Sequence, residues 1–287
     1  MAAEWLTWAL LCASVWGLGT LASKPATDRY GSRLLFLGSA LAEGAAFGIL
    51  GLILPRDPVA LDAAIIALAL AAGAAGVLGY LCFYEGMRRG SVGFVGTITA
   101  AYPVVTVLLS LFVLNEELTH LQGLGIVLTI LCVVLLAYEG KGAKGSSRPA
   151  IILSLLGFLA WGAWGFLAEV GITAMGEGNL FLLYAPAYLA IAALYFLVRK
   201  LPRPDPPTAN RFGLGLALVS IVAGVVGAYA LNIAYKTGPA SLVTPVSGSY
   251  PIIATVGAVL FLRERMGIRL AAALASFGVG LFLLSGV

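Results

Sequence analysis

The sequence predicts an all-α membrane protein whose ten transmembrane helices form two inverted five-helix repeats. Three observations lead to this prediction: the composition, the number of long apolar runs, and an internal repeat. Hydrophobic residues make up 61% of the 287 residues and charged residues only 10%, whereas about a quarter of the residues in soluble domains are charged. The mean hydropathy of +1.01 agrees with this composition. We therefore expect nearly the whole chain to lie in the membrane.

Ten apolar runs are long enough to cross a bilayer, for which an α-helix needs about 18 residues or more. The first run follows a segment whose only charged side chain is Glu4. It therefore lacks the basic region of a signal peptide, and we expect it to be retained as a helix. The connections are short and leave little material for a soluble domain. The runs are approximately 5–23, 34–54, 61–87, 91–114, 121–138, 150–173, 179–198, 211–235, 240–262 and 268–286.

The internal repeat relates the two halves of the chain and decides the fold. Shifting the stretch 79–117 by 148 residues places it on 227–265. Both copies are apolar runs with a Tyr-Pro pair beyond the middle. The matched positions are Gly79 with Gly227, Arg88 with Lys236, Gly90 with Gly238, Tyr102 and Pro103 with Tyr250 and Pro251, and Glu116 with Glu264.

The repeat divides the chain into a first five-helix unit at 1–139, a linker at 140–149 and a second unit at 150–287. The linker is rich in Gly, Ser and Lys, as expected of a flexible connection. Because five is an odd number, the two units must enter the membrane from opposite sides. Inverted repeats are common in secondary transporters, where the substrate site lies near the midplane between the repeats.

The basic residues are distributed very unevenly between the two sides of the predicted bundle. The connections after spans 1, 3, 5, 7 and 9 carry 15 of the 17 basic residues, and the other side holds only Arg56 and Lys236. Basic loops remain cytoplasmic, so both termini are predicted to face away from the cytoplasm. A multi-pass protein of a bacterial or archaeal plasma (inner) membrane is expected. The charges decorate membrane exits and form no single patch, which argues against nucleic acid as a partner.

The paired motifs resemble those of a known family. A Trp-Gly pair occurs in the first span of each half (16–17 and 161–162), and the sequence Asn-Glu-Glu-Leu-Thr at 115–119 is followed by Gln122 and Gly123. Together with the Tyr-Pro pairs, they resemble the EamA-type members of the drug/metabolite transporter superfamily. The resemblance implies a central cavity lined by helices one to four and six to nine, with helices five and ten packing the halves together. It also implies transport of amino acids and other small metabolites. The Arg-Glu-Arg-Met sequence at 263–266 departs from the family pattern.

Glu43 is the most informative single residue, because it lies in the middle of the second span with apolar or small residues on both sides. A carboxyl group at the bilayer centre is costly and usually faces a cavity or a partner on a solute or proton pathway. We predict that Glu43 binds substrate and couples transport to a proton. The alternative is a protonated Glu43 that hydrogen-bonds to a neighbouring helix and only holds the bundle together.

The other substrate-binding candidates are aromatic or polar residues in spans expected around the cavity. Tyrosine and tryptophan also gather at membrane interfaces for their amphipathic character alone. Glu169 fits a cavity mouth or a structural role, and Asn232, at the position of Tyr84 in the first copy, fits the cavity or a bond between helices. For Glu85 an ion pair with Arg88 and Arg89 is favoured. The candidates are Trp16, Tyr80, Tyr84, Tyr102, Trp164, Glu169, Asn232 and Tyr250.

Two prolines and two carboxylates are candidates for bending or gating. Pro103 and Pro251 interrupt the helical hydrogen bonding at matched depths, and such points can bend during a transport cycle. Glu116 and Glu264 close the fourth and ninth spans at equivalent positions, which suggests a role shared by both halves.

Several functions are disfavoured by missing motifs. His120 is the only histidine, the three cysteines all lie in apolar spans, and no zinc-protease, phosphate-loop or paired intramembrane Asp pattern occurs. We therefore predict no enzyme activity, no cofactor and no metal, and the energy for transport must come from a gradient or an exchanged solute.

The sequence as a whole predicts a secondary transporter of a small polar metabolite that works by alternating access. An amino acid or related amine and the export direction are favoured, because a carboxylate with aromatic neighbours suits an ammonium group. The alternatives are a flippase for a lipid or a lipid-linked sugar and an uncoupled facilitator. The expected partners are the small-molecule substrate and membrane lipid. A monomer is sufficient, and a dimer is left open.

Overall fold

The computed structural model describes the chain except residues 1, 61, 90–91, 138–146, 199–210, 254–255, 257–267 and 285–287. The described residues are helical almost throughout, and none of them forms a strand. The helices are α1 (Ala2–Tyr30), α2 (Ser32–Ile53), α3 (Ala63–Met87), α4 (Val92–Ala100), α5 (Pro103–Val113), α6 (His120–Ala137), α7 (Arg148–Val198), α8 (Arg211–Thr237), α9 (Ala240–Ser247) and α11 (Ile268–Leu284).

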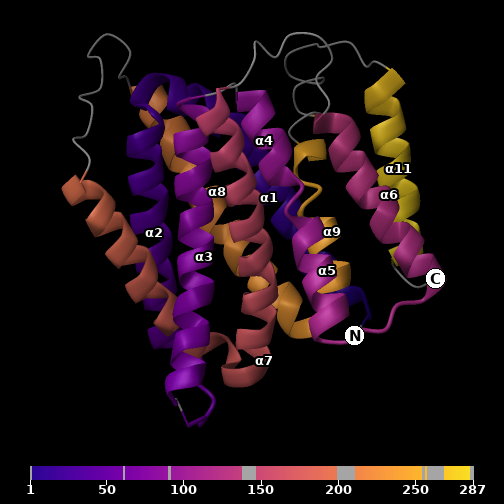
Figure 1. Ribbon diagram of the computed structural model, residues 1–287, viewed down its shortest axis with the longest axis horizontal. Helices are drawn as coiled ribbons and strands as arrows, with labels where there is room; N and C mark the ends of the chain where they lie inside the picture. Colours follow the sequence, from indigo (N-terminus) through magenta and orange to yellow (C-terminus); the bar gives the residue numbers. More distant parts are fainter. Residues whose placement is uncertain are drawn as a thin grey trace.

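The helices run roughly along one direction and form a bundle with two distinct ends (Figure 1). The upper end holds the turn at Gly31 between α1 and α2 and the turn at 88–89 after α3. The lower end holds the α2–α3 connection at 54–60 and the turn at 238–239 between α8 and α9. The start of α1 and the end of α11 both lie toward the lower end (Figure 1).

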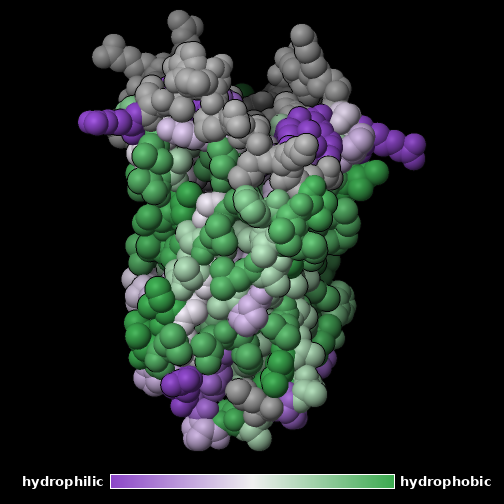
Figure 2. Space-filling model, turned by 90° about the vertical axis from the view of Figure 1, so that its left-hand side faces the viewer, coloured by the Kyte–Doolittle hydropathy of each residue, from purple (hydrophilic) through white to green (hydrophobic). Residues whose placement is uncertain are grey.

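The outer surface of the bundle is apolar along most of its length. Leu197 is 80% exposed and Phe112 78% exposed, and Figure 2 shows a band of hydrophobic side chains between hydrophilic ends. Soluble monomers rarely expose apolar patches of this extent. By length and composition, α1, α2, α3, α7 and α8 can each cross a membrane. The surface and the helices therefore fit a protein surrounded by lipid.

The predicted sixth and seventh spans belong to one element, α7, which reverses direction at Gly176. This residue has a φ of 73°, a conformation that glycine adopts without steric cost. The reversal packs against the α2–α3 connection, where Asn179 Nδ2 donates to the Asp57 carbonyl at 2.9 Å. The segment after Gly176 then returns along α2, so that Tyr195 meets Phe36 with ring centroids 4.8 Å apart. Residues 150–173 and 179–198 thus form two antiparallel legs.

The predicted fourth span is broken near its middle, at the Tyr-Pro pair. Helix α4 ends at Ala100, and α5 begins with Pro103. The ninth span behaves similarly, because α9 ends at Ser247 and helical backbone resumes at Pro251. Proline has no N–H and its ring clashes with the preceding turn, which explains why both breaks precede a proline. Residues 257–262 of the ninth span lie outside the described part of the chain.

Reciprocal contacts join the two halves of the chain. Trp16 on α1 donates its indole N–H to the Gly224 carbonyl on α8 at 3.3 Å. Trp161 on α7 donates to the Gly76 carbonyl on α3 at 3.2 Å. Gly76 and Gly224 are 148 residues apart, and the two tryptophans belong to the matched Trp-Gly pairs. The first helix of each half therefore packs on the third helix of the other half.

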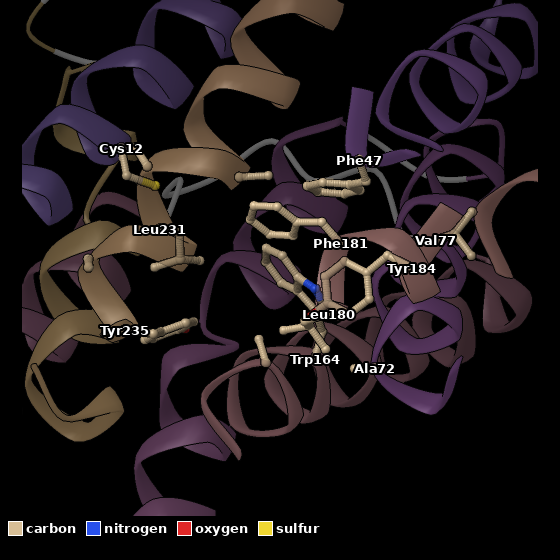
Figure 3. Packing of buried hydrophobic residues seen from close by; sticks show 14 of the residues in the cluster. Cys12, Phe47, Ala72, Val77, Trp164, Leu180, Phe181, Tyr184, Leu231 and Tyr235 are labelled. Atoms are coloured by element: carbon tan, nitrogen blue, oxygen red, sulfur yellow. The ribbon is translucent and has the colours of Figure 1, made fainter. Parts of the chain in front are cut away.

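The lower half of the bundle interior is filled by side chains. The Phe47 ring stacks on Phe181 at 5.2 Å and meets Tyr184 edge-on at 5.3 Å. All three are fully buried, and Figure 3 shows them packed beside Trp164 and Leu180. This packing contrasts with the cavity above it.

Candidate functional site

An aromatic cavity of about 100 Å³ lies between the two halves, near the middle of the bundle. Six of the nine predicted substrate-binding residues line it: Trp16, Tyr80, Tyr84, Tyr102, Trp164 and Tyr250. Other lining residues were not among the predicted binding residues, most importantly Trp161, Tyr188 and the matched glycines Gly76 and Gly224. The remaining lining residues are Gly19, Thr20, Ser23, Ser39, Gly76, Phe83, Trp161, Tyr188, Ser220, Ala223 and Gly224.

The cavity extends from the middle of the bundle toward its upper end. Thr20 and Ser23 follow Trp16 by one and two turns of α1, in the direction of the upper end. Tyr84 lies in the last turns of α3 at the same end. Below the cavity stands the packed group of Phe47, Phe181 and Tyr184. The molecule is therefore hollow toward the upper end and closed toward the lower end.

Glu43 lies directly behind the cavity wall and is only 1% exposed. The Tyr80 hydroxyl donates to Glu43 Oε1 at 2.6 Å, and Tyr188 also hydrogen-bonds to this carboxyl group. On the α8 side, the absence of a side chain at Gly224 leaves room beside the carboxyl group. Two tyrosines thus connect a carboxyl at the bundle centre to the cavity.

The cavity walls are built from aromatic rings in mutual contact. The rings of Trp16 and Trp164 lie 6.4 Å apart, and Trp16 meets Tyr250 edge-on at 5.9 Å. On the opposite wall, Trp161 meets Tyr80 edge-on at 5.3 Å and Tyr102 at 6.3 Å. Aromatic faces beside a carboxyl group favour an organic cation. The rings also restrict the cavity to a small solute.

Glu169 is placed outside the cavity lining, at the lower end of the bundle. Its Oε1 accepts the Ala240 backbone N–H at 2.9 Å, and Ser110 Oγ lies 3.4 Å from Oε2. Glu116 Oε2 accepts the next N–H, from Ser241, at 3.3 Å. Glu116 and Glu169 are therefore neighbours at this end of the bundle. Together they accept two N–H groups of the first turn of α9, the end of a helix that attracts negative charge.

Asn232 also lies outside the cavity lining. Its side chain is fully buried and donates to the Ala228 carbonyl of the same helix at 2.7 Å. The shorter amide does not take the place that the Tyr84 phenol has in the first half. Glu264, the predicted counterpart of Glu116, lies outside the described residues.

Glu85 forms the predicted ion pairs at the upper end. Its Oε2 lies 2.8 Å from Arg88 Nη2 and 2.5 Å from Arg89 Nη1. Tyr195 donates to Oε1 at 2.6 Å, so this carboxylate ties the end of α3 to the end of α7. Among the described residues, no group of His, Cys, Asp and Glu side chains is arranged to hold a metal ion.

Three comparisons relate the chain to other proteins. A model of the EamA-like transporter family matches residues 3–138 and again residues 148–286. An uncharacterized protein of Methanocaldococcus jannaschii is 28% identical over 135 residues, which covers 45% of this chain and 92% of that protein. A solved structure described as the crystal structure of a protein matches with a TM-score of 0.75 at 18% identity, covering 98% of this chain and 96% of the other. That structure indicates a shared fold.

Proposed function

Because the chain belongs to the EamA-like transporter family, whose members are membrane transporters of small molecules, we propose that it is a secondary transporter of a small polar metabolite. An amino acid or a related amine is the favoured substrate, and export is the favoured direction. The observation that carries the substrate class is Glu43, a buried carboxyl joined to an aromatic cavity by two tyrosines.

The proposed architecture is ten transmembrane helices in two inverted repeats, at 1–139 and 150–287. The reciprocal bonds of Trp16 and Trp161 to the matched glycines support it. The family model matches each half separately, and one relative contains little more than a single half. In such a structure each half can adopt the other's conformation, which opens the cavity to alternate sides of the membrane.

The state of the molecule in the transport cycle follows from the basic residues. Arg33, Arg88 and Arg89 lie at the upper end, which we therefore assign to the cytoplasm of a bacterial or archaeal cell. Both termini then face away from the cytoplasm. On this assignment the cavity extends toward the cytoplasmic end, which supports an inward-facing state that would load a substrate for export.

Closure of the opposite end involves Glu116, Glu169 and the start of α9. Both carboxyl groups hold backbone N–H groups of α9, and the breaks before Pro103 and Pro251 allow the neighbouring segments to bend. For this end to open, the N–H groups of Ala240 and Ser241 must separate from Glu169 and Glu116. Glu116 and Pro103 therefore serve as parts of a gate in the proposed cycle.

Proton coupling is assigned to Glu43 as part of the same proposal. A substrate ammonium group and a proton would compete for this carboxyl group, so that outward movement of one is linked to inward movement of the other. Accumulation in proteoliposomes with an imposed pH gradient tests the coupling. Full gradient-driven accumulation by Glu43→Gln would show that the proton is bound elsewhere or not used.

Substrate binding is tested by a thermal-shift screen of purified protein against amino acids, organic cations, nucleosides and phosphorylated sugars. An ammonium group about 4 Å from a carboxylate gains up to ~4 kcal/mol at an effective dielectric constant of about 20. We expect Glu43→Gln to weaken binding of amino acids or amines at least tenfold, whereas Glu117→Gln, an exposed carboxylate at the lower end, leaves binding unchanged. Equal binding by wild type and Glu43→Gln would show that Glu43 does not contribute to substrate binding. Stabilisation by lipids alone would favour a flippase.

A further inference from the structure

A second pocket, of about 440 Å³, lies at the upper end of the bundle, between the α1–α2 turn and the end of α3. We call it the arginine pocket. None of its described lining residues also lines the aromatic cavity. Asp28 and Arg88 are exposed, so charged groups of the pocket reach the surface of the bundle. The described lining residues are Thr27, Asp28, Gly31, Ser32, Arg33, Met87 and Arg88.

The internal repeat shows which part of the second half corresponds to this pocket. A shift of 145 residues, which relates the two Trp-Gly pairs, also takes the Leu-Phe-Leu sequence at 35–37 to the Leu-Phe-Leu sequence at 180–182. The same shift takes Gly31 to Gly176. These two are the only glycines of the described chain with a positive φ, at 79° and 73°. The turn at Gly31 and the reversal at Gly176 are therefore equivalent points at opposite ends of the bundle.

At the lower end this position holds an ion pair. Glu177 directly follows the reversal, and its Oε1 accepts a hydrogen bond from Lys236 Nζ at 3.1 Å. The equivalent residues of the first half are Ser32, at the shift of 145, and Arg88, at the shift of 148. Both line the arginine pocket. The upper end therefore keeps the basic member of the pair but has a short neutral side chain in place of the acidic member.

Other carboxylates near the pocket do not balance its arginines. Glu85 Oε1 lies 3.7 Å from Arg33 Nε. Its Oε2 lies 2.8 Å from Arg88 Nη2 and 2.5 Å from Arg89 Nη1. Asp28, in the pocket lining, adds a second negative charge. Three positive charges thus face two negative charges among these described groups, which leaves a net charge of about +1 beside the pocket.

The start of α2 also favours an anion in the pocket. Helix α2 begins at Ser32, and no side chain caps its first turn at Gly31. The backbone N–H groups at such a helix start attract negative charge. A guanidinium group presents planar N–H donors that match the oxygens of a phosphate. The pocket therefore combines room, positive charge and donors for a phosphate group.

We propose that the arginine pocket binds an anionic phosphate group, which takes the place that the Glu177 carboxylate has at the lower end. The phosphate joins the start of α2 to the end of α3. It belongs either to the headgroup of an anionic membrane lipid or to a soluble phosphate. Basic pockets at membrane exits suit lipid headgroups, and the upper end borders the apolar band of the surface (Figure 2). The inference depends on neither the substrate nor the direction of transport proposed above.

Thermal unfolding of the purified protein in detergent tests the proposal. Inorganic phosphate is added at constant ionic strength with chloride as the reference, and anionic phosphatidylglycerol is compared with zwitterionic phosphatidylcholine. At least one of the two phosphate probes should stabilise wild type. Arg33→Gln removes a lining guanidinium group and should weaken the apparent affinity about tenfold. Arg148→Gln, an exposed arginine of α7 outside the pocket lining, should respond like wild type.

Ser32→Glu is the sharper variant, because it removes no arginine and supplies the carboxylate that the second half has at this position. It should abolish the response to phosphate and to phosphatidylglycerol. In chloride alone it should be at least as stable as wild type, because the new carboxylate would fill the anion site. A Ser32→Glu protein less stable than wild type in chloride would count against an anion site here.

The pattern of responses identifies the source of the phosphate. Stabilisation by phosphatidylglycerol alone assigns the pocket to a lipid headgroup, and stabilisation by inorganic phosphate assigns it to a soluble phosphate. A wild type that responds to neither probe would refute the proposal. So would a response that Ser32→Glu retains, or one that Arg148→Gln loses as fully as Arg33→Gln, since surface charge alone would then explain it.

Discussion

Alanine at Gly76 should displace Tyr188 from Glu43, because the added Cβ would lie 2.5 Å from the Tyr188 hydroxyl. A separation of about 3.4 Å is needed for ordinary contact, and Tyr188 is 1% exposed, with little room to move. The Cβ would also stand 3.2 Å from Trp164 Cδ1. The substitution therefore acts on two walls of the proposed substrate site at once.

The size of the effect can be worked from the contacts. Loss of a hydrogen bond to a charged group costs roughly 1.5–3 kcal/mol, and alanine regains about 1 kcal/mol of helix propensity over glycine. We expect Gly76→Ala to lower the free energy of unfolding by about 1–2 kcal/mol. Its repeat-equivalent, Gly224→Ala, places a Cβ at 3.0 Å from Glu43 Oε1 and 3.4 Å from Tyr80 Oη. Because these distances are longer than those at Gly76, Gly224→Ala should cost less stability.

Binding should respond differently from stability. Both alanines narrow the access to Glu43, so both should weaken substrate binding by about tenfold or more, equivalent to ~1.4 kcal/mol. Gly215→Ala is the matched control, since nothing lies within 4 Å of a Cβ at this position of α8. Thermal unfolding in detergent and calorimetry measure the two effects. Gly76→Ala with the stability and affinity of Gly215→Ala would refute the placement of Tyr188 against Glu43.

Three further substitutions test other parts of the structure. Glu169→Gln keeps an acceptor for the Ala240 N–H but removes one of the two acidic groups at the start of α9, so proteoliposome transport should slow by about tenfold with substrate affinity unchanged by calorimetry. Glu85→Gln leaves the arginines of the upper end without a charged partner and should lower thermal stability by roughly 1–3 kcal/mol, again with unchanged affinity. Gly176→Ala adds a side chain at a φ of 73°, against Asp57, and should destabilise the protein by at least ~1 kcal/mol in the same unfolding assay.

Hydropathy identified long apolar helices in the sequence but could not tell which side of each helix faces the cavity. Residues 150–173 and 179–198 were recognised as separate spans, and Gly176 provides the reversal between them. Which side of each span faces the cavity is a different question. In a membrane both lipid and protein neighbours are apolar, so periodic hydrophobicity distinguishes the two faces poorly.

Tyr188 illustrates this limit. It was not selected from the sequence, because the seventh span reads as an ordinary apolar run with one proline. Phe181, Tyr184, Tyr188 and Tyr195 nevertheless recur at helical spacing, and three of them are in the group around Phe47. An aromatic stripe at that spacing in a transmembrane run was the available signal. Only the structure shows that Tyr188 in this stripe contacts Glu43 on the facing helix.

Matched positions in the repeat were a sound guide to packing and a weaker guide to chemistry. The paired Trp-Gly and Gly positions make equivalent contacts in the two halves. Asn232 was selected because it aligns with Tyr84, but its side chain reaches only its own helix. At equivalent backbone positions, the longer Tyr84 side chain lines the cavity, whereas the shorter Asn232 side chain does not.

This difference between packing and chemistry fits the proposed transport cycle. If the two halves exchange conformations, the contacts that hold them together must exist in equivalent form in both halves. The hydrogen bonds of Trp16 and Trp161 are such an equivalent pair. The proposed substrate, an amino acid or amine, is asymmetric in contrast, and the groups proposed to bind it are not duplicated. A shift of 148 residues takes Tyr80 to Ala228, and the offset of the Trp-Gly pairs takes Trp164 to Gly19. In the proposed cycle, a symmetric scaffold around a one-sided site would let the same binding groups serve both faces of the membrane, because the scaffold would move around the bound solute while the solute kept its contacts.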